Sequence, residues 1–172
     1  SKETVAEKIR TGEIIFNADE TGIIRKIYLD TVDGRAPESI WFGKDVGTTR
    51  EANGEIKAIF EGKAPFDTPK PSRLIKRIMQ IAAVRDDDII LDSFAGSGTT
   101  AHAVLNMNKA DGGHRKFILV EMMDYADSIT AERVKRVIDG YGEDKKAVEG
   151  TGGNFSYYEL GPVLMLPDGN LN

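Results

Sequence analysis

Two short apolar runs of the sequence each end in an acidic residue, a pattern that could bind a ligand. Residues 89–91 lead into Asp92, and residues 117–120 lead into Glu121. Runs of this kind are typical of buried parallel strands, and ligands of such sheets bind at the carboxyl ends of the strands. The two carboxylates are therefore expected at the ligand-binding edge of a sheet.

A turn of small residues follows Asp92 and leads into a predicted helix. The turn and the first helical residues, all candidates for ligand contact, are Phe94, Ala95, Gly96, Ser97, Gly98, Thr99 and Thr100. Glycine permits positive φ and lets a ligand approach bare backbone, and the start of a helix offers unpaired N–H groups. No lysine follows Gly98, which excludes the phosphate-binding loop that ends in Lys-Ser/Thr. We interpret the segment as a cofactor loop rather than an ordinary strand-to-helix turn.

The acidic residues narrow the class of cofactor but leave two candidates. Glu121 follows the loop by roughly the twenty residues expected of an acid that binds ribose hydroxyls, which both NAD and S-adenosylmethionine carry. Asp92, beside the loop, would repel a pyrophosphate and would suit an ammonium group. The alternative is that Asp92 only accepts hydrogen bonds from nearby backbone N–H groups.

The surrounding pattern predicts an α/β fold with a parallel sheet. From residue 72 onward the predicted elements are a helix over 72–84, a strand over 89–92, a helix over 99–107, a strand over 116–121, a helix over 126–138 and a strand over 155–160. In the first helix, the residues predicted to be buried are Leu74, Ile75, Ile78, Met79 and Ala82. In the last helix, Arg133, Lys135 and Arg136 are predicted to point outward. The glycine-rich segment 145–153 is expected to be mobile.

The N-terminal part is predicted to hold a helix and a β-hairpin. The helix covers residues 3–10, and the hairpin strands, 13–16 and 23–29, flank a turn that ends at Gly22. Residues 43–50 look irregular. Asn53 is interpreted as the N-cap of a helix over residues 55–60.

Composition excludes several classes of site and location. The 172 residues carry a net charge of −5, so no global basic field points to nucleic acid. There is no cysteine for a disulfide or a thiolate metal site. The two histidines, His102 and His114, lack metal-ligand spacing and are expected on the surface or in loops, so no metal ligand is assigned. No apolar run reaches membrane-spanning length and no signal peptide is visible, so a cytoplasmic location without membrane contact is expected.

The loop resembles the cofactor loop of the amino-methylating DNA methyltransferases. Residues 92–100 carry the resemblance, and residues 68–71 (Thr-Pro-Lys-Pro) look like the element that precedes the loop in permuted members. Residues 101–104 and 112–120 most resemble the modification subunits of type III restriction–modification systems, which methylate adenine N6 in DNA. The resemblance is specific over residues 66–138 and weaker over 12–62.

The resemblance implies a partial Rossmann-like, S-adenosylmethionine-dependent methyltransferase sheet, with the hairpin-containing region before it. Residues 94–100 would surround the methionine part of the cofactor, with Asp92 near its ammonium. Glu121 would hold the ribose hydroxyls, and Met122 would lie near the adenine. Lys70 would close over the carboxylate end, although a solvated side chain is the alternative. The implied regions are a target-recognition or connecting region (1–62), an S-adenosylmethionine-binding half-domain (63–161) and a tail (162–172).

The family's catalytic motif, Asp or Asn followed by two prolines and an aromatic residue, is missing from the sequence. We therefore assign no catalytic residue. We expect the chain to be an inactive C-terminal portion of a DNA adenine-N6 methyltransferase, with double-stranded DNA as the substrate of the full-length protein. A restriction subunit and a second copy are candidate partners. Half of a sheet would expose an edge and an apolar face, which predicts self-association or a partly open cofactor site.

Three other functions stay open at this point. The chain could be a non-catalytic relative that binds DNA or a partner. It could belong to a methyltransferase that acts on RNA or a small molecule. The third is half of a dinucleotide-binding dehydrogenase.

Overall fold

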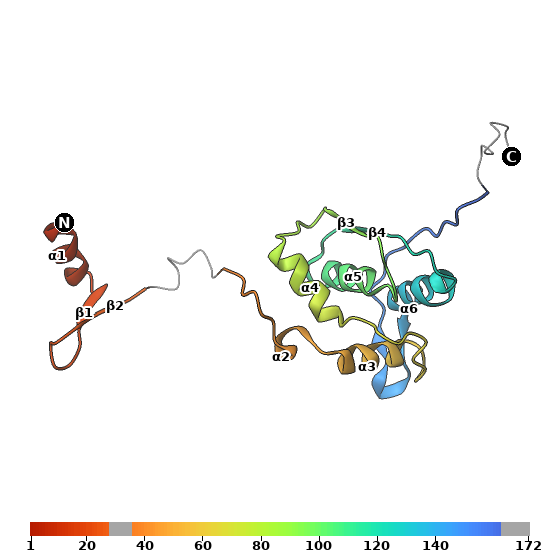
Figure 1. Ribbon diagram of the computed structural model, residues 1–172, viewed down its shortest axis with the longest axis horizontal. Coiled ribbons are helices and arrows are strands. Elements are labelled where there is room, and N and C mark those ends of the chain that lie inside the picture. Colours follow the sequence, from red (N-terminus) through yellow and green to blue (C-terminus); the bar gives the residue numbers. More distant parts are fainter. Residues whose placement is uncertain (28–35, 163–172) are drawn as a thin grey trace. The chain divides into compact units, whose positions relative to one another are not determined.

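The computed structural model (Figure 1) describes residues 1–27 and 36–162, and the chain forms two compact units. The units comprise Ser1–Ser39 and Ile40–Asn172. The functional boundaries suggested at residues 62 and 161 stay predictions, and the suggested tail lies, apart from Pro162, outside the described residues.

The first unit contains the predicted helix and hairpin. Helix α1 (Lys2–Arg10) begins after Ser1, whose hydroxyl accepts the Thr4 N–H. Strands β1 (Ile14–Phe16) and β2 (Ile23–Arg25) pair antiparallel, with Ile15 opposite Ile24. The side chain of Asn17 closes the turn by accepting the Gly22 N–H at 2.7 Å. The hairpin is therefore confirmed, with a shorter second strand, and residues 28 and 29 lie outside the described part.

Three helices precede the central strand in the second unit. They are α2 (Gly43–Val46), α3 (Thr49–Ile59) and α4 (Ser72–Ile81). The prediction of Asn53 as an N-cap was wrong, because Thr48 caps α3 and Asn53 lies inside it. The buried face predicted for 72–84 was wrong in part. Met79 is buried and Leu74 and Ile75 are half-buried, whereas Ile78 and Ala82 are exposed.

The centre of the unit is a parallel β-α-β arrangement, as predicted. Strand β3 (Ile89–Asp92) pairs with β4 (Lys116–Leu119), and α5 (Thr99–Asp111) connects them. Ile90 and Phe117 pack against a core cluster that contains Val104 and Met107 of α5.

The interpretation of both strands as buried holds for one face of the sheet only, and the exposed apolar face expected of half a sheet is present. Side chains alternate along each strand, and Ile89 and Leu91 are 60% and 64% exposed. The neighbouring strand shows the same alternation, because Ile118 is also exposed. One face of the sheet is covered by α5, and the other face is open within the described chain.

The C-terminal part departs most from the prediction. A π-helical turn (Ala126–Ala131) leads into α6 (Glu132–Asp139), and the short strands β5 (Gly140–Tyr141) and β6 (Val148–Glu149) pair antiparallel. The segment predicted to be mobile thus holds β6 and a 3₁₀ turn (Asp144–Lys146). The predicted strand over 155–160 was wrong, because those residues are irregular and Phe155 packs on the core instead.

The main core joins α3, α5 and α6. Its buried residues are Ile56, Ile59, Phe60, Ala101, Leu105, Ile129, Val134 and Val137. Across the two described stretches, no helix is long and apolar enough to cross a membrane.

Candidate cofactor-binding site

Asp92 joins the two ends of the glycine loop. At the end of β3, its Oδ1 accepts the Phe94 N–H at 3.1 Å, and its Oδ2 accepts the Thr100 hydroxyl at 2.5 Å. The carboxylate thus fixes the loop where it leaves the strand and where it enters α5. Asp92 thus accepts one backbone N–H, as in the alternative interpretation, and also a side-chain hydroxyl, and its contact with an ammonium stays a prediction.

The backbone of the loop needs both of its glycines. Gly96 and Gly98 have φ values of +52° and +76°, a region that favours glycine. A Cβ on Gly98 would also lie 3.0 Å from the carbonyl oxygen of Thr130. The Thr130 hydroxyl donates to the Gly96 carbonyl at 2.6 Å. The loop is therefore packed against the π-helical turn that leads into α6.

Glu121, just beyond the end of β4, holds the other side of the loop. Its Oε2 accepts the Gly96 N–H at 2.8 Å, and its Oε1 accepts the N–H groups of Met122 and Met123 at 2.9 and 3.1 Å. Burial, followed by the Glu121 carboxylate, raises the pKa of Tyr125. The structure thus brings Asp92 and Glu121 to one loop, as their positions in the sequence predicted.

Apolar side chains lie at the same end of the strands. Phe94 and Met122 are 83% and 85% exposed, so both are available to a ligand. Phe66 and Tyr125, which sequence reasoning missed, form an edge-to-face pair with ring centroids 5.4 Å apart. A Cβ on Gly96 would lie 3.3 Å from the Phe66 ring, so Phe66 contacts the loop. Its place two residues before the Thr-Pro-Lys-Pro segment was the available signal.

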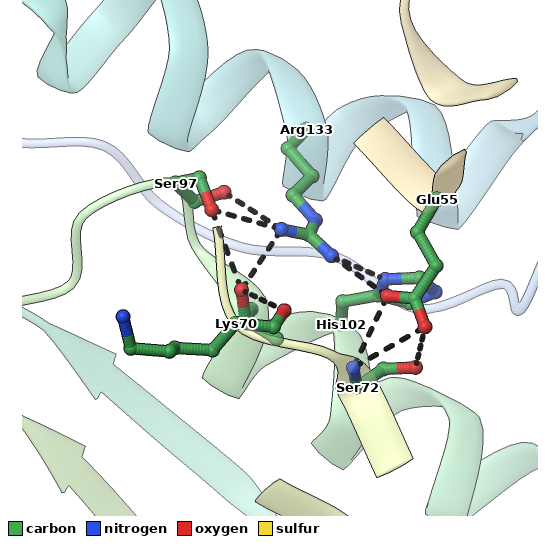
Figure 2. A network of polar contacts seen from close by, with 7 residues as sticks. Glu55, Lys70, Ser72, Ser97, His102 and Arg133 are labelled. Carbon is green, nitrogen blue, oxygen red and sulfur yellow. Dashed lines mark hydrogen bonds and ion pairs between the residues drawn. The ribbon is translucent and has the colours of Figure 1, made fainter. Parts of the chain in front are cut away.

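Lys70 meets the loop through its backbone rather than its side chain. Its carbonyl accepts the Thr99 hydroxyl at 3.2 Å, and the neighbouring Pro69 is fully buried. The side chain is exposed and extends away from the network in Figure 2, with Nζ 3.4 Å from the Thr68 carbonyl. The solvated alternative thus describes this side chain here, and closure over a cofactor stays a prediction.

Arg133 of α6 lies at the centre of a buried network (Figure 2), which corrects its predicted outward position. Its Nη1 donates to the hydroxyls of Ser97 and Thr99 at 3.0 and 2.9 Å, and its Nη2 lies 3.6 Å from Oε2 of Glu55. Burial lowers the pKa of Arg133 to about 10, and the Glu55 carboxylate opposes that shift. The guanidinium is therefore still charged at neutral pH. Of its two predicted outward neighbours, Lys135 is exposed and Arg136 is half-buried.

His102 was also expected at the surface and is instead buried beside Arg133. Nη2 of Arg133 lies 3.0 Å from Nδ1 of His102. Because a guanidinium only donates, Nδ1 is the acceptor and the ring proton is on Nε2. Burial, and then the charge of Arg133, lower the pKa of His102 to about 3, which keeps the ring neutral.

No metal site accompanies this loop in the part of the chain that the structure describes. Within residues 1–27 and 36–162, no group of three or more His, Asp or Glu side chains is arranged to hold an ion. The polar groups around the loop are carboxylates, backbone groups and hydroxyls, which suit an organic ligand that carries a cation and hydroxyl groups.

Comparison with known proteins places the loop in a family context. The sequence model of the DNA methylase family (N6_N4_Mtase) matches residues 6–132. The chain is 37% identical over 139 residues to the type III restriction-modification enzyme StyLTI Mod subunit of Salmonella typhimurium, covering 72% of this chain and 21% of the relative. It is 42% identical over 122 residues to the type II methyltransferase M.KpnI of Klebsiella pneumoniae, covering 70% and 28%. With the EcoP15I Mod subunit of Escherichia coli, the identity is 31% over 141 residues, covering 81% and 20%. The chain thus spans between a fifth and three tenths of the length of these relatives.

Proposed function

The chain belongs to the DNA methylase family, and on that premise we propose that it is the S-adenosylmethionine-binding part of a DNA adenine-N6 methyltransferase of a type III-like restriction–modification system. The observation that carries the proposal is the double attachment of the glycine loop. Asp92 and Glu121, at the ends of adjacent parallel strands, each hold one side of it. We further infer that β3 and β4, which α5 connects, form part of a Rossmann-like sheet.

The groups around the loop fit the chemistry of this cofactor. The Asp92 carboxylate would attract the ammonium of the methionine part, and Glu121 would accept hydrogen bonds from the ribose hydroxyls. Each carboxylate has acceptor capacity beyond its bonds to the loop. Phe94 and Met122 offer exposed apolar surface to an adenine ring. A pyrophosphate would instead meet two carboxylates, which argues against NAD.

When bound, S-adenosylmethionine supplies the methyl group that is transferred. The residues of this chain would bind and orient it, and their contribution to the rate would be proximity and orientation. The polar group that accepts the hydrogen bonds of the target amine, and the ring that stacks on a flipped base, would lie in a part of the protein outside this sequence. Residues 1–62 would belong to the target-recognition or connecting region.

The names of the relatives support the proposed substrate and partners. Mod subunits of type III restriction-modification enzymes are among them, so we propose double-stranded DNA as the substrate of the full-length protein and a restriction subunit as a partner. The proposed location is the cytoplasm, where that DNA lies. These assignments concern the whole protein, of which this chain is the proposed cofactor part.

Calorimetric titration of the chain with S-adenosylmethionine and, separately, with NAD tests the proposal. We expect saturable binding of S-adenosylmethionine alone. Asp92→Asn removes the charge and retains an acceptor for the loop, and should weaken binding about tenfold or more, as expected for loss of a charge-assisted hydrogen bond. Asp111→Asn is the matched control, because Asp111 pairs with Arg115 at the far end of α5. NAD binding, no binding of S-adenosylmethionine, or an Asp92→Asn variant equal to the control would contradict the proposal.

A further inference from the structure

Arg133 bonds to the cofactor loop from a position that no ligand can reach. Its side chain is 0% exposed, and Figure 2 shows it between the loop on one side and Glu55 on the other. A residue in this position can influence a ligand only through the groups that it holds. Burying a charge is costly unless it is paired, and an apolar residue of similar volume often stabilises a core at least as well. Stability alone therefore gives little reason for an arginine here.

The hydrogen bonds of Arg133 go to the loop side chains. Nη1 reaches the hydroxyl of Ser97, the hydroxyl of Thr99 and, at 3.4 Å, the Ser97 carbonyl. The Thr99 hydroxyl in turn donates to the Lys70 carbonyl at 3.2 Å. One guanidinium nitrogen thus fixes both the end of the loop and, through Thr99, the segment that contains Lys70. These two segments are the ones that would enclose the cofactor.

Glu55 extends the same network to a third segment. Its carboxylate faces Nη2 of Arg133 and accepts the Ser72 N–H at 3.1 Å and the Ser72 hydroxyl at 2.9 Å. Ser72 is the first residue of α4, and Pro71, the N-cap residue, gives that helix no side-chain cap. Glu55 therefore caps α4 from a different helix, and it fixes the point where the Lys70 segment enters α4.

We propose that Arg133, paired with Glu55, is the positioning residue of the cofactor site. It holds Ser97 and Thr99, and through Thr99 the Lys70 backbone, in the arrangement that the cofactor meets, so that little ordering is left to occur on binding. The identity of the cofactor rests on the proposed function, whereas the ordering of the loop by Arg133 can be measured without any ligand.

Arg133→Lys, compared with Arg136→Lys, provides the test. Lysine retains the charge but lacks the planar guanidinium, so its single ammonium cannot bond to both hydroxyls and to Glu55 at once. Arg136 lies on the same helix and bonds to Glu132, Glu61 and the Ile59 carbonyl, none of which belongs to the loop. Both variants therefore lose an arginine network of α6, and only one of these networks contacts the loop.

Two measurements are made at a temperature where each variant is folded by circular dichroism. The first is amide hydrogen exchange of Gly96 and Gly98, whose N–H groups are bonded within the site. We expect these amides to exchange about tenfold faster in Arg133→Lys than in Arg136→Lys, because the loss of one charge-assisted hydrogen bond has about that effect. The exchange rates of the β4 amides should be unchanged in both variants. The second is S-adenosylmethionine affinity, which should fall about tenfold in Arg133→Lys alone.

The outcomes separate this inference from the proposed function. Equal loop exchange in the two variants overturns the positioning role, whatever the affinity. If the loop amides exchange faster in Arg133→Lys but the parent chain binds no S-adenosylmethionine, the result supports the positioning role and counts against S-adenosylmethionine as the cofactor. If Arg133→Lys does not fold, Thr99→Val removes the hydroxyl that links Arg133 to the Lys70 carbonyl. In that variant, faster exchange of Gly98 supports the inference and unchanged exchange overturns it.

Discussion

At the scale of single residues, His102 is neutral because its burial, and then the charge of Arg133 beside it, lower its pKa. Arg133 donates to Nδ1, and burial removes the water that would stabilise an imidazolium. A protonated ring would place two positive groups in contact inside the core. The histidine therefore serves as a hydrogen-bond acceptor for the arginine, and its protonation should open the network.

The folded chain should accordingly lose stability in mildly acidic solution. The pKa of His102 is lowered from 6.5 to about 3, so below about pH 6.5 the unfolded chain binds a proton that the folded chain does not. Stability from this group is full above that pH and falls as the pH drops towards 3. We expect a loss of about 2 kcal/mol between pH 7 and pH 5.

Urea unfolding at a series of pH values measures this effect. His102→Gln, which retains an acceptor and cannot titrate, should show a shallower decrease, whereas His114→Gln, at an exposed position, should follow the parent chain. Equal pH slopes in the parent and in His102→Gln would refute the assignment.

The buried state of Arg133 and His102 could not be predicted from local sequence. Both lie in helices where spacing assigns faces, and a charged residue is normally assigned to solvent. The groups that compensate Arg133 are remote in sequence: Ser97 is 36 residues away, and Glu55 belongs to another helix. By contrast, Asp92 and Glu121 were predictable because each position depends only on the end of its own strand.

At the scale of elements, the start of α3 has a signature in the sequence. Thr48 and Glu51 form a capping box, in which the Thr48 hydroxyl accepts the Glu51 N–H and the Glu51 carboxylate accepts the Thr48 N–H. The pattern Thr-x-x-Glu predicts such a start, whereas only its residue type favours Asn53 as an N-cap. Glu51 also pairs with Arg73 of α4 at 2.6 Å, so the cap joins two helices.

Alanine substitution should distinguish the two assignments of this cap. Thr48→Ala should lower the free energy of unfolding by about 1 kcal/mol, the usual effect of losing an N-cap side chain. Asn53→Ala should leave stability unchanged or raise it, because alanine is the better helix former inside α3. Chemical denaturation measures both, and a larger loss for Asn53→Ala would restore the original interpretation.

The central β-α-β arrangement was predicted well and the end of the chain was not, for a physical reason. Short apolar runs joined by a helix of fitting length define a parallel pair almost by themselves. Alternation over residues 155–160 has no such support, because a strand also needs a neighbour to pair with. There Phe155 packs against the core without strand pairing among the described residues.

At the scale of the whole molecule, the second unit has an open apolar sheet face. Ile89, Leu91, Ile118 and Val120 alternate with residues that face α5, and all four are exposed. An apolar face of this kind is typical of an interaction surface. We therefore expect the isolated chain to associate with itself at high concentration.

Light scattering over a range of concentrations tests this expectation. The average mass should rise with concentration, and the double substitution Leu91→Thr and Ile118→Thr should suppress the rise. Val5→Thr, at an exposed apolar position on α1, is the control and should leave association unchanged. A constant monomer mass in the parent chain would show that the open face does not drive association.

The pairing of Glu55 with Arg133 has a consequence for how such proteins can be recombined. A hybrid joined at residue 62, the boundary suggested by the sequence, would inherit α3 from one parent and α6 from the other. The charge buried in α6 would then depend on whatever residue the first parent carries in place of Glu55, and the contacts of Ile56 and Ile59 would be mismatched as well. A junction before Ile40 retains the pair and the helices in a single parent. In a hybrid that exchanges the proposed recognition region, the junction should therefore lie before Ile40, so that α3 stays with the proposed cofactor-binding part.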